Sequence, residues 1–128
     1  MTFKMKNSDL ALFKKTMSRL DQVPMPVTDC LEFNLLMESL DALLGVVDRR
    51  KLEIVCKYAE SMDDGNIVTV NNEAQFKDPD TKARCLLETG KFMEEYSELG
   101  IKERFRISGK TPMTPAEARF IKDIIEVV

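Results

Sequence analysis

The amino-acid sequence predicts an all-α fold, a single-domain bundle of about five helices that spans residues 1–128. Apolar residues recur at helical spacing along most of the chain, and capping residues and prolines mark the ends of these segments. The length fits one domain with its own core. No apolar run approaches the roughly 20 residues needed to cross a bilayer, and none of signal-peptide length follows the first lysines, so we expect a cytoplasmic protein with no membrane contact.

The first helix is expected to begin at Ser8, whose hydroxyl is a suitable N-cap. It should end before residues 23–26, because prolines at positions 24 and 26 lack the amide proton and restrict the preceding residue. Within it, apolar residues spaced by three and four share one face: Leu10, Phe13, Met17 and Leu20.

The second and third helices are predicted on either side of Gly45. The second begins at Thr28 or Asp29 and carries an apolar stripe wide enough, with Leu31 and Leu35, to make it the most buried helix. Gly45 is a plausible left-handed terminator, and Asp48 can cap a third helix that runs to Met62.

Residues 63–66, Asp-Asp-Gly-Asn, predict a turn, and residues 67–70 have the β-branched content of a short strand. A strand needs a partner. The only other extended candidate is residues 105–108, so a small two-stranded β-ribbon between these segments is the one β-element considered.

Two further helices have sharp start signals. Asp78-Pro79-Asp80 opens a fourth helix that should reach Gly100, with Gly90 inside it as a point of close approach for a neighbouring helix. The last helix starts at the capping box Thr114-Pro115-Ala116-Glu117 and continues to Val128 through isoleucines at helical spacing.

Composition argues against catalysis and against metal or cofactor binding. The chain has no histidine, and its three cysteines, at positions 30, 56 and 85, are isolated and are expected to be buried reduced thiols. Gly109-Lys110-Thr111 resembles the end of a phosphate-binding loop but lacks its first glycine and its following helix. The acidic residues at 63, 64 and 73 do not match the spacing of a calcium loop, and those at 94, 95 and 98 fit a solvated helix face.

Nucleic-acid binding is the alternative function. Met37 to Ile54 partly matches a helix-turn-helix with Gly45 in the turn, which would present a basic run to a DNA groove. A basic segment at 102–110 could hold phosphates while an aromatic ring stacks on a base. The candidate residues are Arg49, Arg50, Lys51, Lys102, Arg104, Phe105, Arg106 and Lys110.

The favoured function is a small non-enzymatic protein that binds and modulates another protein, as an adaptor, inhibitor or assembly factor. Eight methionines suit an adaptable contact surface, and the compact, histidine-free composition would suit a protein encoded by a virus or mobile element. Met25, between two prolines, is the expected apolar anchor. Phe120 and Val127 lie off the isoleucine line of the last helix, where they could dock a partner or a second copy of the chain.

Overall fold

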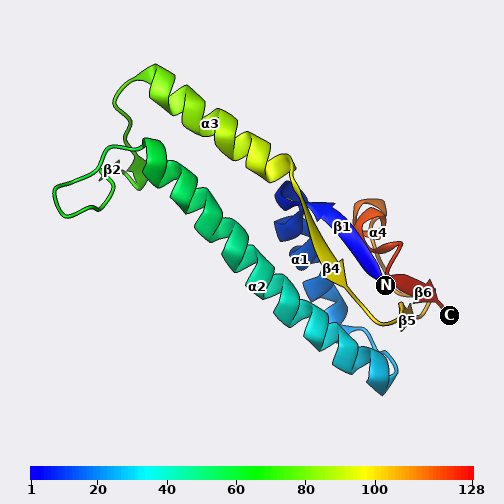
Figure 1. Ribbon diagram of the computed structural model, residues 1–128. Coiled ribbons are helices and arrows are strands. Elements are labelled where there is room, and N and C mark those ends of the chain that lie inside the picture. The colour runs from blue at the N-terminus through cyan, green and yellow to red at the C-terminus, as the bar shows by residue number, and fades with distance from the viewer. The chain divides into compact units, whose positions relative to one another are not determined.

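The computed structural model describes all 128 residues and shows a mixed α/β structure, so the all-α prediction is wrong (Figure 1). Four α-helices are present, and six short strands pair into three two-stranded sheets. In chain order the elements are β1 (Thr2–Lys6), α1 (Leu10–Arg19), α2 (Val27–Tyr58), β2 (Thr69–Val70), β3 (Glu73–Ala74), α3 (Pro79–Glu94), β4 (Tyr96–Gly100), β5 (Phe105–Ile107), α4 (Pro115–Ile121) and β6 (Ile125–Val127). Short 3-10 turns at Asn7–Asp9 and Leu20–Gln22 flank α1.

The chain divides into two compact units. The first contains residues 1–44 and 96–128, and the second contains residues 45–95. Helix α2 contributes its N-terminal part to the first unit and its C-terminal part to the second.

In the first unit, β1 and β4 form an antiparallel pair that joins the unit's two sequence segments, residues 1–44 and 96–128. Phe3 lies opposite Leu99, and Lys4 lies opposite Glu98. The alternation in β1 turns Phe3 toward the core, where its ring meets Phe13 edge-on at 5.8 Å between centroids. The fourth helix therefore ends at Glu94 and not at Gly100, because residues 96–100 pair with the N-terminal segment.

The first unit also holds a small β-α-β arrangement. Strands β5 and β6 are parallel, with Phe105 opposite Ile125, and α4 lies in the connection between them. Parallel strands need such a crossover, since a tight turn can join only antiparallel neighbours. The last helix was expected to reach Val128, but it ends at Ile121 and the β-branched residues after it form β6.

The helix starts predicted at Thr114 and Asp78 are confirmed, whereas the one predicted at Ser8 is not. The Thr114 hydroxyl accepts from the Glu117 amide and the Glu117 carboxylate accepts from the Thr114 amide, which is the predicted capping box. Asp78 caps α3 by accepting from the Thr81 amide at 2.7 Å. Ser8 does not cap α1, which starts two residues later after a 3-10 turn.

The core of the first unit forms between α1, the first part of α2 and the strands. The apolar face predicted for α1 is confirmed, since Leu10, Phe13, Met17 and Leu20 are all buried. They are joined by Phe33, Leu36, Leu40, Leu99, Ile101, Phe105, Ile107, Ile121 and Ile124.

Helix α2 is unbroken over 32 residues, so the end predicted at Gly45 and the separate third helix are wrong. Gly45 lies inside the helix, and a Cβ at this position would meet nothing within 4 Å. Glycine disfavours a helix without preventing one, and the apolar face continues past it to the buried Val47 and Ile54. The degenerate helix-turn-helix over Met37 to Ile54 is therefore absent, because its turn is helical.

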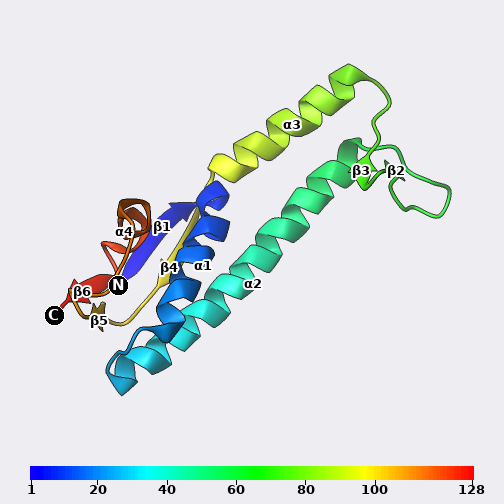
Figure 2. The same cartoon turned by 180° about the vertical axis from the view of Figure 1, so that it is seen from behind.

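In the second unit, α3 runs beside the C-terminal part of α2 (Figure 2), and the Lys57 ammonium pairs with the Glu88 carboxylate across them. The turn at residues 63–66 is confirmed: Gly65 has a φ of +88°, and Asp64 accepts from the Asn66 amide. Strand β2 pairs with β3 and not with residues 105–108, so the predicted ribbon has the wrong partner. No neighbouring atom lies within 4 Å of a Cβ at Gly90, so the expected close approach of a helix of the same chain is absent.

None of the helices combines the length and the apolar character that a membrane span requires.

Candidate functional site

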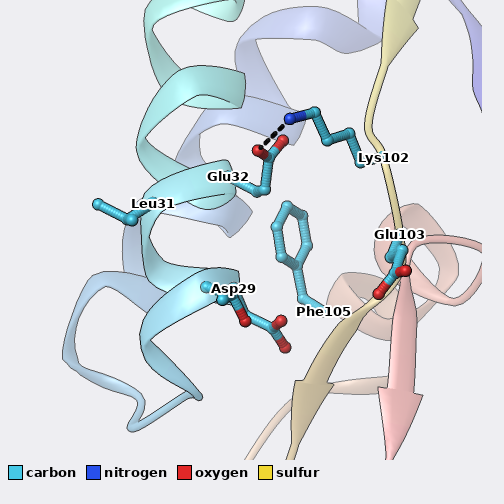
Figure 3. Close-up of a pocket in the computed structure, with 7 residues that line it drawn as sticks. Asp29, Leu31, Glu32, Lys102, Glu103 and Phe105 are labelled. Atoms are coloured by element: carbon cyan, nitrogen blue, oxygen red, sulfur yellow. Dashed lines mark ion pairs between the residues drawn. The ribbon is translucent and has the colours of Figure 1, made fainter.

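A hollow of about 390 Å³ in the first unit is the candidate functional site. It lies between the first turns of α2 and the loop that leads into β5 (Figure 3). Its lining combines apolar, acidic and basic side chains: Thr28, Asp29, Leu31, Glu32, Lys102, Glu103 and Phe105.

Asp29, which lines this hollow, is held by Arg106 of β5. The Arg106 amide and Nε both donate to Asp29 Oδ2, at 2.8 Å and 3.1 Å, and Nη2 donates to Oδ1 at 2.9 Å. Nη2 also donates to the Thr28 hydroxyl at 3.3 Å. The guanidinium fork therefore holds both carboxylate oxygens and ties the first turn of α2 to β5.

This ion pair sets the charge of the site. Hydrogen bonds from the Arg106 side chain lower the pKa of Asp29 below its ordinary value of 3.8, against the opposing effect of burial. The same carboxylate raises the pKa of Arg106. Asp29 is thus an anion at neutral pH with both oxygens occupied, which suits it to hold the site in shape and not to transfer protons.

The other charged groups of the hollow are at its edge. Lys102 reaches from the loop to Glu32 on α2, with 3.4 Å between Nζ and Oε1, and the Phe105 ring lies between helix and loop (Figure 3). Phe105 in turn meets Phe33 edge-on at 5.7 Å between ring centroids. Glu103 is exposed and has no cation within ion-pair distance, although its charge adds to that of Asp29 in raising the pKa of Arg106. It is therefore the carboxylate of the hollow that is left to meet a cation from outside.

An exposed apolar row continues from the hollow along the outer side of α2. Val27, Leu31 and Leu35 follow at intervals of four and are 75%, 62% and 53% exposed. The buried side chains of this part of α2, Phe33, Leu36 and Leu40, lie on its other side. The prediction that Leu31 and Leu35 widen the buried stripe is therefore wrong, because α2 has two apolar faces and only one is covered.

The residues proposed for nucleic-acid binding are not brought together as expected. Phe105 is buried and cannot stack on a base, and Arg106 is held by Asp29. Lys102 pairs with Glu32, while Arg104 and Lys110 are exposed. In the second unit Arg49, Arg50 and Lys51 continue α2, and Arg50 pairs with Glu53.

The residues proposed for partner binding also have separate positions. Met25 is half-buried and lines a small hollow with Cys30 and Phe33, so it is no free anchor. Phe120 is half-buried in another hollow beside Phe3 and Tyr96. Val127 in β6 is 64% exposed, which leaves it open to solvent as expected.

The remaining polar chemistry is sparse. No three of the chain's cysteine, aspartate and glutamate side chains are grouped so as to hold a metal ion. Only Cys85 of the three free cysteines is buried, whereas Cys30 is half-buried and Cys56 is exposed.

Sequence reasoning missed this hollow because its parts come from residues 28–32 and 102–106. The apolar residues at intervals of four can be seen in the sequence, but they were assigned to the buried face of the helix. Their spacing alone does not tell which face of a helix the rest of the chain covers. Comparisons of this chain with protein-family models, with curated proteins and with solved structures found no match.

Proposed function

We propose that this protein is a non-enzymatic binding protein that modulates a partner protein through the hollow at the start of α2. One observation carries the proposal: the exposed row Val27, Leu31 and Leu35 adjoins a hollow whose walls are already fixed by ion pairs. A contiguous apolar surface beside a preformed hollow is typical of protein-binding sites.

The chemistry of the hollow describes the partner segment. An apolar side chain fits against Leu31, and a lysine or arginine beside it fits Glu103, whose carboxylate has no ion pair. Asp29 and Glu32 are already neutralised by Arg106 and Lys102, so one added cation suits the site better than several. An amphipathic helix with apolar residues at intervals of four and a basic residue at its edge has this pattern.

The experiment is affinity capture from cells of the source organism with matched variants. Leu31→Glu should lose most of the captured partner, because it places a charge in the middle of the exposed row. Leu12→Glu is the control, since Leu12 is a similarly exposed leucine on α1. Neither side chain is buried, so circular dichroism should show that both variants fold.

A photo-crosslinking residue at position 31 should attach to the same partner, and one at the exposed Lys122, directly after α4, should not. Nuclease treatment separates the alternative function, in which Arg104 and Lys110 contact nucleic acid. Capture that disappears with nuclease, or that is equal in the Leu31 and Leu12 variants, would contradict the proposal.

A further inference from the structure

A second hollow, of about 330 Å³, lies in the second unit, where the end of α2 meets α3. Tyr58 of α2 lines it together with four residues of α3: Arg84, Leu87, Glu88 and Lys91. Its volume falls in the range of small-ligand sites, which is roughly 300–1,000 Å³.

The one carboxylate that lines this hollow, that of Glu88, already has its partners. The Lys57 ammonium of α2 lies 3.2 Å from each of its two oxygens. Hydrogen bonds with Tyr58 and with Lys57 lower the pKa of Glu88, so this side chain is ionised at neutral pH. Lys57 also lies 5.1 Å from the centroid of the Tyr58 ring. These contacts hold the ring in place and balance the negative charge of Glu88.

The two cations of the hollow have no such partner. Arg84 and Lys91 are exposed, and neither forms an ion pair. The pKa of Asp78 is lowered mainly by hydrogen bonds with Thr81, and the charge of Arg84 adds to this effect although no ion pair joins them. Leu87 is 61% exposed and shares the helix face of both cations. The hollow therefore presents two unpaired positive charges beside an apolar side chain and an aromatic ring.

Acidic residues limit this positive charge to the length of the hollow. Asp80 precedes Arg84 by four residues and Glu95 follows Lys91 by four, and neither acid lines the hollow. A long polyanion that followed α3, such as a nucleic-acid strand or an acidic helix, would meet both carboxylates and be repelled. An anion small enough to fit the hollow would meet only the cations.

From these contacts we propose that the hollow binds a small phosphate ester that carries an apolar ring. A phosphate monoester has a charge of about −1.5 to −2 at neutral pH, so it can neutralise both cations, whereas one carboxylate would leave one of them unpaired. The guanidinium fork of Arg84 suits two phosphate oxygens, and Lys91 adds a point charge. The ring of the ligand then packs against Leu87 and Tyr58.

Nucleotides and phosphorylated phenols share this chemistry. The inference is independent of the proposed function, because that function uses the first unit.

NMR titration of the ¹⁵N-labelled full chain tests the proposal, with phenyl phosphate as the probe. The amide signals of residues 84–91 should shift and saturate, with a dissociation constant of about 1 mM or below. Nuclear Overhauser effects should connect the ring protons of the probe to Leu87 and Tyr58. Inorganic phosphate, which lacks the ring, should bind at least threefold more weakly, and phenol, which lacks the phosphate, should give no saturable shift.

Two double variants separate the hollow from a general effect of charge. Arg84→Gln combined with Lys91→Gln should weaken the binding of phenyl phosphate at least tenfold. The control is Lys77→Gln combined with Lys82→Gln, which removes the same charge from two exposed lysines of the second unit that do not line this hollow. It should leave the affinity within twofold of wild type. All four side chains are exposed, so circular dichroism should show native helix content in both variants.

A comparison of adenosine monophosphate with phosphotyrosine identifies the ligand source, since the tighter of the two shows whether the hollow prefers a nucleotide or a phosphorylated phenol. Shifts that do not saturate by about 10 mM phenyl phosphate would overturn the proposal. Equal loss of binding in the two double variants would do the same. So would a single-stranded oligonucleotide that shifts the signals of residues 84–91 at lower concentration than either small ligand.

Discussion

The Asp29 carboxylate and the Arg106 guanidinium join two segments that lie 77 residues apart in the sequence. Asp29 is in the first turn of α2, and Arg106 is in the middle of β5. The pair satisfies a buried acid, and it also gives α2 a negative charge near the positive end of its dipole. One interaction therefore holds the start of α2, which lines the candidate site, to strand β5.

The first prediction concerns the pH dependence of this pair. The pKa of Asp29 is lowered from 3.8, so its contribution to stability is present above about pH 3.8 and is lost as the pH falls through the folded-state pKa. Asp29→Asn should be less stable than wild type at neutral pH, and the difference should shrink below pH 3.8. Urea denaturation midpoints measured across the acid range check this.

The control is Asp21→Asn, because Asp21 is exposed and forms no ion pair. It should show no such pH-dependent difference from wild type. Arg106→Lys should be destabilised as well, since an ammonium cannot hold both carboxylate oxygens in the same fork. A difference for Asp29→Asn that stays constant at all pH values would show that its charge does not stabilise the fold.

The second prediction tests the continuity of α2. Gly45→Ala should raise the free energy of unfolding by about 1 kcal/mol, because alanine favours a helix interior and the added Cβ meets nothing within 4 Å. Chemical denaturation of the purified variant gives this value directly.

A left-handed helix end at Gly45 predicts the opposite sign, since a Cβ is strained at positive φ. Gly65→Ala is the control with that geometry, because Gly65 has a φ of +88°. It should lower stability by about 1 kcal/mol. A Gly45→Ala variant that is less stable than wild type would therefore support a helix end at Gly45 and a separate third helix.

The parts of the fold that sequence predicted correctly depend on near neighbours. Asp78 and Thr114 cap the helices that follow them, because a cap needs only residues three positions away. Strands β1, β4 and β6 were missed because each is stabilised by a partner distant in sequence. Ile124 and Val128 fitted a helical period, although the β-branched run that contains them also favours a strand.

The candidate site was less predictable than the fold. Arg106 was proposed as a ligand for phosphate, whereas in the structure it is held by Asp29, which lies 77 residues away in the chain. Leu31 was assigned to the core for a similar reason. Periodicity identifies the apolar faces of a helix, whereas burial depends on how many of those faces the rest of the chain can cover.

The last prediction tests whether residues 125–127 form a strand. Glu126 is exposed at the middle of β6, so its side chain is free to change without altering the core. Glu126→Thr should be more stable than Glu126→Ala, within the span of about 1 kcal/mol that β-propensities cover, because a β-branched residue favours a strand. The same two substitutions at the exposed Arg119 of α4 should give the reverse order, since alanine favours a helix. The four variants are compared by their denaturation midpoints. If the alanine variant is more stable than the threonine variant at both positions, the last helix continues to the C-terminus.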